Sequence, residues 1–176
     1  MKHVTPLALA VAAALACGHT QAAGFADDAS ASLQLRNFYF NRDFRDPGAQ
    51  SKAEEWAQGF IFKAESGYTE GFIGFGVDVY AGLGLKLDSD DQRAGSGLLP
   101  NSFGDEGKDS YSEATAAVKA RMSNTVLKVG GLMPKLPVVS SGDSRLLPQS
   151  FTGASLSVSE IENLVIQAGQ LREVNY

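Results

Sequence analysis

The segment from Ile73 to Leu87 constrains the fold most, because apolar side chains occupy every second position in it. Residues two apart share a face on a β-strand, whereas on a helix the same set would spread around the whole cylinder. At about 3.3 Å per residue this strand would be roughly 50 Å long, far beyond the usual strand of a soluble domain. The length is typical of a tilted membrane-barrel strand, although a bent strand of a soluble sandwich could also reach it.

The N-terminal segment 1–22 has the pattern of a secretory signal peptide. Lys2 and His3 precede an apolar, alanine-rich run, and small residues lead to an expected cleavage site after Ala22. The run has about 13 residues, too few for a helix that crosses a bilayer. A buried N-terminal helix and a lipoprotein site at Cys17 are the alternatives.

Cleavage after Ala22 would leave a chain with very little reactive chemistry. Cys17 is the only cysteine, and both histidines, His3 and His19, precede the cut. The mature chain would therefore have no disulfide, no cysteine nucleophile and no histidine for a catalytic triad or a metal. Its formal net charge would change from −5 to −6 with the loss of Lys2, which argues against nucleic-acid binding. We expect no enzyme, no cofactor and no metal site.

Other alternating segments predict further strands, separated by connections of two lengths. The expected strands are 31–40, 56–66, 111–122, 126–132, 154–158 and 164–171. The connections alternate between long polar loops and short turns, which is typical of outer-membrane barrels. The long ones are 41–54, 88–109 and 134–153. The segment 111–122 also has residues that favour a helix, and a helix is the alternative there.

Charged and polar side chains fall on the strand faces opposite the apolar ones. In a barrel these faces would line the lumen. The candidate pore-lining residues are Lys63, Glu65, Asp78, Tyr80, Glu113, Lys119, Arg121 and Lys128. We expect the basic ones to guide anions with the acidic ones as counter-charges; the alternative is that they mark only a wet surface. Ile61 lies on the same face as Lys63 and does not fit it.

Several ordered motifs resemble the OprD family of outer-membrane porins. They are Leu35–Asp43 (LRNFYFNRD), Trp56–Phe60 (WAQGF), Gly74–Asp78 (GFGVD), Gly82–Asp88 (GLGLKLD) and Gly142–Gln149 (GDSRLLPQ), the last followed by Thr152 and Gly153. The resemblance implies an all-β fold, a transmembrane antiparallel barrel of about 18 strands. Residues 23–176 would supply its N-terminal part, about seven strands of an incomplete barrel. With an open edge in lipid, we expect this chain alone not to form a working pore.

The resemblance also implies a function. The family's members are substrate-selective porins that let small, often carboxylate-bearing nutrients such as amino acids diffuse passively. It places the protein in the bacterial outer membrane, with lipid, lipopolysaccharide, small solutes and the barrel-assembly machinery as partners. The alternatives are a secreted or periplasmic β-sandwich binding protein and a non-functional truncated porin.

The segment 134–153 resembles the family's third loop, which folds inward and narrows the pore. Its candidate constriction residues are Ser140, Ser141, Gly142, Asp143, Ser144 and Arg145. They would supply hydroxyls, a fixed charge pair between Asp143 and Arg145, and a backbone turn at Gly142. An ordinary solvated surface loop is the alternative.

Two further expectations concern small and acidic residues. The glycines at even positions of the 73–87 strand are expected to leave room for the third loop, and they lack the spacing of a nucleotide-binding loop. The carboxylate pairs Glu54–Glu55 and Asp90–Asp91 are expected to lie in solvated loops.

Overall fold

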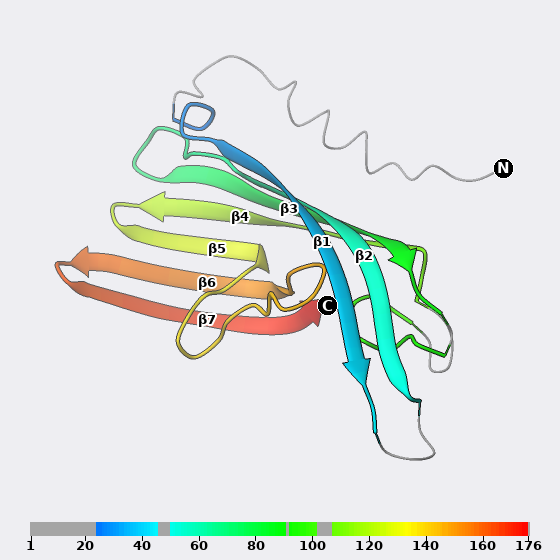
Figure 1. The fold of residues 1–176 in the computed structure, drawn as a ribbon. Coiled ribbons are helices and arrows are strands. Elements are labelled where there is room, and N and C mark those ends of the chain that lie inside the picture. The colour runs from blue at the N-terminus through cyan, green and yellow to red at the C-terminus, as the bar shows by residue number, and fades with distance from the viewer. Residues whose placement is uncertain (1–23, 46–49, 91, 102–106, 176) are drawn as a thin grey trace.

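The structure is a computed structural model that describes residues 24–45, 50–90, 92–101 and 107–175. The predicted signal peptide, including Cys17, lies outside the described residues. Seven strands form one sheet in chain order, each antiparallel to the next (Figure 1). They are β1 (Ser30–Asp43), β2 (Lys52–Glu65), β3 (Gly74–Asp88), β4 (Ser110–Met122), β5 (Thr125–Leu132), β6 (Ser150–Ile161) and β7 (Leu164–Asn175).

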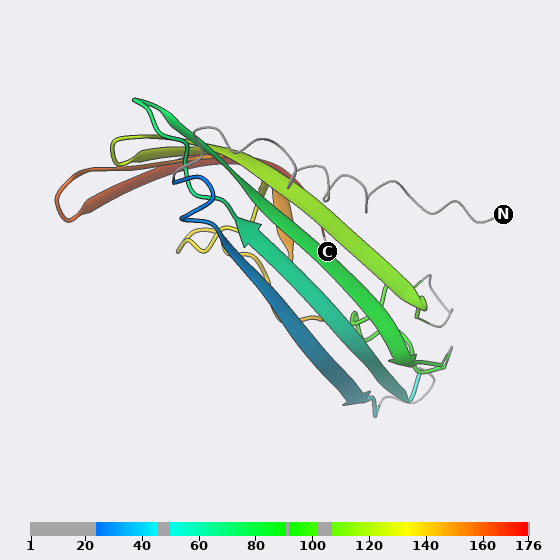
Figure 2. The same cartoon turned by 90° about the horizontal axis from the view of Figure 1, so that it is seen from above.

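The sheet curls into a half-barrel, with successive connections at opposite ends (Figures 1 and 2). The connection 133–149 folds back under the arch of the sheet instead of extending away from it (Figure 2). We call the concave side that it covers the inner face and the convex side the outer face. The predicted alternation of long and short connections holds only from β3 onward, where 89–109 and 133–149 are long and 123–124 and 162–163 are two-residue turns. The connections 44–51 and 66–73 have eight residues each.

The two faces of β3 have the reverse of a soluble protein's exposure. Tyr80, on the inner face, is 4% exposed, whereas Phe75, Leu83 and Leu87 on the outer face are 40–52% exposed. Apolar side chains on a soluble domain would normally be buried in a core. An exposed apolar outer face opposite a polar inner face is the arrangement of a membrane barrel. No helix among the described residues is long and apolar enough to cross a membrane.

The helical alternative for 111–122 is wrong, since the segment is a strand paired on both sides. Val79 of β3 pairs with Ala116, and Val129 of β5 pairs with Val118. Pairing with two neighbours outweighs the weak helical preference of its alanines. The β-sandwich alternative is also wrong for the described residues, which form a single sheet.

The strands extend further toward the long loops than expected. Asp43 of β1 pairs with Lys52 of β2, so the predicted 41–54 loop shrinks to the residues between them. Glu54 and Glu55 therefore lie in β2 and not in a solvated loop. At the opposite end Ile73 belongs to the turn, because the backbone N–H of Thr69 donates to the carbonyl of Phe75 at 2.9 Å.

The last two strands are longer than predicted, and a β-bulge interrupts the alternation of their side chains. β6 begins at Ser150, which ends the predicted 134–153 loop four residues early. The pairing register shifts between Thr152 and Gly153, whose partners are Glu173 and Leu171. Arg172 is the extra residue of this bulge, and a bulge interrupts the alternation of side chains. The pattern therefore fades at Leu171 although β7 continues to Asn175.

Candidate pore wall and constriction

Two apolar clusters on the inner face anchor the inward-folded loops. The first joins Ala57 of β2 with Leu98 and Leu99 of the loop 89–109 and Leu146 of the loop 133–149. The second joins Ile61, Tyr80 and Leu147. Ile61, which did not fit a polar face, is 1% exposed because Leu147 covers it. The inner face therefore carries apolar side chains where loops sit on it.

Polar contacts from β1 fix the segment 143–145. The Arg36 guanidinium donates to the Asp143 carboxylate at 2.8 Å and to the Arg145 carbonyl at 2.6 Å. The sequence predicts a charge pair between Asp143 and Arg145. In the structure Asp143 is instead paired with Arg36. The Arg145 guanidinium lies 5.7 Å from the centre of the Phe40 ring, a cation–π distance.

The first half of the loop 133–149 is a small hairpin, residues 134–141. The Ser141 N–H donates to the Pro134 carbonyl at 2.8 Å, and the Leu136 N–H donates to the Val139 carbonyl at 2.9 Å. Val138 at its tip is 91% exposed.

Gly142 closes the base of this hairpin. The Gln149 N–H donates to the Gly142 carbonyl at 2.8 Å, and the Gln149 side-chain oxygen accepts from the Gly142 N–H at 3.2 Å. The φ angle of Gly142 is not in the left-handed region, so other residues could adopt the same backbone there.

Glycines make room for the loop at two places. A Cβ atom on Gly82 would lie 2.9 Å from Cδ1 of Leu147, and one on Gly59 would lie 3.1 Å from the carbonyl oxygen of Leu146. The expectation for the even-numbered glycines of β3 is thus correct for Gly82. It is wrong for Gly74, Gly76 and Gly84, whose space is taken by other groups, Tyr68, Lys119 and Tyr111 among them.

An ion cluster crosses β3, β4 and β5 on the inner face. The Asp78 carboxylate lies 2.6 Å from the ammonium groups of both Lys119 and Lys128. These two lysines are direct cross-strand partners, a pairing of like charges that is unfavourable without a counter-ion. Asp78 supplies that counter-ion.

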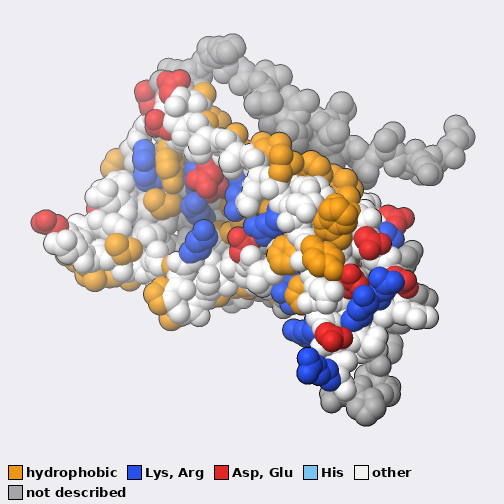
Figure 3. All heavy atoms as spheres, viewed as in Figure 1, with side chains coloured by type: hydrophobic (Ala, Val, Ile, Leu, Met, Phe, Trp, Pro, Cys, Tyr) orange, Lys and Arg blue, Asp and Glu red, His pale blue; other side chains and the backbone are white. Residues whose placement is uncertain are grey.

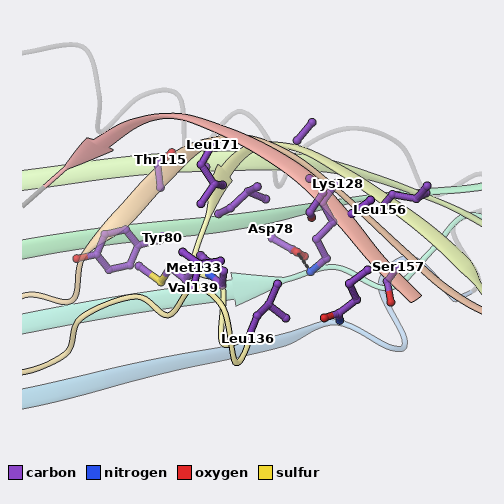
Figure 4. Close-up of a pocket in the computed structure, with 18 of the residues that line it drawn as sticks. Asp78, Tyr80, Thr115, Lys128, Met133, Leu136, Val139, Leu156, Ser157 and Leu171 are labelled. Atoms are coloured by element: carbon purple, nitrogen blue, oxygen red, sulfur yellow. Dashed lines mark hydrogen bonds and ion pairs between the residues drawn. The ribbon is translucent and has the colours of Figure 1, made fainter. Parts of the chain in front are cut away.

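A cavity of about 410 Å³ lies between the hairpin 134–141 and the sheet. Met133, Leu136 and Val139 of the loop side face Asp78 and Lys128 of the sheet across it (Figure 4). Lys63 also lines this cavity. Apolar groups thus cover one side of the cavity, and charged groups lie on the other.

The structure brings five of the eight predicted pore-lining residues to this cavity. They are Lys63, Glu65, Asp78, Tyr80 and Lys128. Lys119 is 4% exposed and is buried in its ion pair with Asp78. Arg121 stacks on the Tyr68 ring at 4.2 Å, near the short turns, and Glu113 accepts a hydrogen bond from Ser150.

Charged side chains gather in the hollow of the sheet and at the loop end of β1 and β2, whereas hydrophobic side chains cover the middle of those strands (Figure 3). No group of three or more histidine, cysteine, aspartate or glutamate residues in the described ranges could hold a metal ion.

Sequence reasoning missed Arg36 and Glu55. Arg36 could have been found, because it lies on the polar side of the first predicted strand. Glu55 could not, because its strand was predicted to start one residue later, at Trp56. Phe38 and Phe40 interrupt the polar side of β1 because they pack against the first apolar cluster.

An antiparallel meander with an apolar outer face, a charged inner face and a loop folded across that face defines the wall of a β-barrel porin. The comparisons with known proteins agree. The model of the family described as "outer membrane porin, OprD family" matches residues 23–176. The chain belongs to the OprD family of outer-membrane porins.

Two curated relatives are similar over most of the chain. Porin D of Pseudomonas aeruginosa is 46% identical over 164 residues, which cover 93% of this chain and 37% of the relative. The porin-like protein GalP of Pseudomonas putida is 47% identical over 154 residues, 86% of this chain and 37% of the relative. The chain thus spans less than two fifths of the length of either protein.

Solved structures give the same result. OccK9 (OpdG) of Pseudomonas aeruginosa superposes with a TM-score of 0.83 and is 55% identical, covering 86% of this chain and 39% of that one. A BenF-like porin from Pseudomonas fluorescens Pf-5 has a TM-score of 0.83 and 47% identity over the same shares. OpdK of Pseudomonas aeruginosa, crystallised with vanillate, has a TM-score of 0.78 and 42% identity, covering 86% of this chain and 38% of that one.

Proposed function

We propose that these residues form part of the wall and the constriction of a substrate-selective porin in the bacterial outer membrane. The pore lets small, carboxylate-bearing nutrients such as amino acids diffuse passively. The observation that carries the proposal is the cavity under the hairpin 134–141, where basic groups of the sheet face apolar side chains of the loop.

The charge balance of this cavity favours an anion. Lys128 and Lys119 share the single carboxylate of Asp78, and Lys63 and Glu65 also line the cavity. The three lysines thus exceed the two carboxylates by one positive charge. No salt bridge to Lys63 is found in the described part of the chain. Rings or ladders of basic side chains select anions in pores, since charge at a narrow passage acts over a short distance.

The loop gives the passage a second property. Leu136 and Val139 offer apolar contacts to the body of a solute whose carboxylate lies near Lys63 or Lys128. OpdK, one of the similar structures, contains vanillate, which is a carboxylate with an apolar ring. The candidate constriction residues Ser140, Ser141 and Ser144 would offer hydroxyls on the way. Passage through such a pore involves no chemical step and so no catalytic residue.

The first test asks whether the product of the complete reading frame that contains these residues is a pore. We expect it in outer-membrane fractions, with heat-modifiable migration on gels and discrete conductance steps in planar bilayers. Membrane lipid, lipopolysaccharide and the barrel-assembly machinery are its proposed partners. A protein that never reaches the outer membrane and shows no conductance would instead be a non-functional product.

The second test addresses selectivity. Benzoate should reduce the single-channel current, and benzamide, its neutral analogue, should not. Lys63→Gln and Lys128→Gln should each weaken the block by benzoate several-fold. Lys108→Gln, a change at an exposed loop position, is the matched control and should leave the block unchanged. Equal block by the acid and the amide would contradict the proposed preference for carboxylates.

A further inference from the structure

Glu55 is a buried carboxylate on the inner face of β2, 1% exposed. Its neighbour Glu54 projects to the other side of the strand, where it bonds to Tyr39 and forms ion pairs with Lys52 and Arg93. Burial of a carboxylate is unfavourable unless hydrogen bonds replace its water. The hydrogen-bond donors around Glu55 therefore explain how its carboxylate can be buried.

Those groups come from the loop 89–109. The Glu55 carboxylate accepts hydrogen bonds from the Ser96 N–H at 3.0 Å, from the Ser96 hydroxyl, and from the Ser89 hydroxyl at 3.3 Å. One oxygen faces Ser96 and the other faces Ser89, so a single side chain joins two points of the loop.

The hydroxyl oxygen of each serine also accepts a hydrogen bond from a backbone N–H group of the same loop. The Ser96 hydroxyl oxygen accepts from the Leu98 N–H at 3.0 Å, and the Ser89 hydroxyl oxygen accepts from the Gly107 N–H at 3.2 Å. A Cβ atom on Gly107 would lie 2.8 Å from Oε1 of Glu55, so only glycine lets the backbone approach this closely. Both ends and the middle of the loop thus converge on Glu55.

The position of Leu98 and Leu99 follows from this network. They pack on Ala57 and against Leu146 of the loop 133–149. The Tyr111 hydroxyl donates to the Leu98 carbonyl at 3.2 Å, which holds the same turn from β4. A Cβ atom on Gly97 would lie 3.1 Å from Nε of Arg145, so the two loops also meet beside a candidate constriction residue.

We propose that Glu55 is a positioning residue for the constriction: by fixing the loop 89–109 it holds Leu98 and Leu99 against Leu146 and so limits how far the loop 133–149 can move into the pore. The proposal extends the proposed function, because it assigns a role in conduction to a residue that does not line the cavity. It predicts that the two inward loops move together when Glu55 is changed.

The test uses a cysteine reporter at Ala57, which is 0% exposed under both loops. Ala57→Cys is made in a Cys17→Ala background of the complete reading frame, and its reaction with a water-soluble maleimide is timed in outer membranes. We expect the reporter alone to react slowly. Adding Glu55→Ala should raise the rate at least tenfold, and Ser96→Ala should raise it less, because Ser89 would still bond to Glu55.

Two further variants separate positioning from a general loss of structure. Glu55→Gln keeps the shape and one acceptor oxygen, so it should recover most of the slow labelling. Glu162→Ala, an exposed change in the turn between β6 and β7, should have no effect. Heat-modifiable migration of every variant shows whether the barrel has formed. If Glu55→Ala prevents barrel formation, the milder variants Ser96→Ala and Glu55→Gln test the proposal. Faster labelling in Ser96→Ala than in the parent would support it, and unchanged labelling in both variants would contradict it.

Conductance completes the experiment. Glu55→Ala should change the single-channel conductance at least 1.5-fold and increase its noise, whereas Glu55→Gln should stay near the parent. Unchanged labelling and unchanged conductance in a folded Glu55→Ala protein would overturn the proposal. Absence of conductance in the parent would refute the proposed function, and the labelling would still report whether Glu55 holds the loops.

Discussion

Arg36 and Asp143 meet across the inside of the sheet, with 2.8 Å between Nη1 and Oδ1, although 107 residues separate them in the chain. The contact joins β1 to the segment proposed to narrow the pore. Because Asp143 is 59% exposed, the ion pair itself contributes about 1 kcal/mol or less. Its importance is geometric, since the same guanidinium also holds the Arg145 carbonyl.

Replacement of Arg36 should therefore loosen the constriction without unfolding the barrel. We expect Arg36→Ala to raise single-channel conductance and current noise, because both hydrogen bonds to the segment 143–145 are lost. Asp143→Asn should have a smaller effect of the same sign, since the bond to the Arg145 carbonyl remains. Planar-bilayer recordings measure both, and an Arg36→Ala channel identical to the parent would contradict this role.

The absence of a side chain at Gly82 is predicted to be necessary for Leu147 to pack on the sheet. A Cβ atom there would be 2.6 Å from the Tyr80 hydroxyl oxygen and 2.9 Å from Leu147. Gly82→Val should push Leu147 off Ile61, with a cost of about 1–3 kcal/mol typical of overpacking. Conductance and urea unfolding in lipid vesicles measure the effect. Ala81→Val, next to it on the outer face, is the matched control and should be near neutral.

Asp78 is predicted to hold two like charges together. Asp78→Asn would leave Lys119 and Lys128 facing each other, one of them buried, and should destabilise the protein by about 2–4 kcal/mol. The second change Lys119→Met should recover much of the loss. Asp109→Asn, whose side chain is 91% exposed in its pair with Lys86, should cost less than about 1 kcal/mol. Equal urea midpoints for the Asp78 and Asp109 variants would contradict the prediction.

Leu35 and Gln34 test the assignment of the two faces directly, because they are adjacent and project to opposite sides of β1. Leu35 is 64% exposed on the outer face. Leu35→Arg should destabilise insertion by about 2–4 kcal/mol if it lies near the bilayer midplane. Gln34→Arg, toward the lumen, should cost much less. Folding into lipid vesicles followed by gel migration compares them, and a reversed order would mean that the faces are exchanged.

The strands and their faces could be predicted from the sequence because alternation has the same meaning in every strand. The exact strand ends could not. β1 and β2 extend as far as Asp43 and Lys52 through backbone pairing. The side chains in that stretch are mostly polar on both faces, so the sequence there shows no alternation that predicts a strand. The sequence pattern does not reveal the last residues of β7, because the extra residue Arg172 reverses which side chains share a face beyond the bulge.

The loops could be predicted only in part. That 134–153 folds inward followed from its resemblance to a known loop, but its contacts did not. Ile61 interrupted the polar face with no partner visible in the local sequence, because its partner Leu147 lies far along the chain. Glu55 appeared to be one of two solvated acids, since only the fold of the loop 89–109 surrounds it with serines. Long-range packing of irregular segments leaves no periodic pattern to detect.

The exposed side chains of Leu33, Leu35 and Phe75 have a consequence for how this protein can be handled. They make the bilayer a structural component, as necessary to the outside of β1 to β3 as the inward loops are to the inside. Without an amphiphile along this stripe, the same side chains would bring copies of the chain together. The choice of detergent tail should therefore affect the outer surface of the barrel far more than the loop-covered interior.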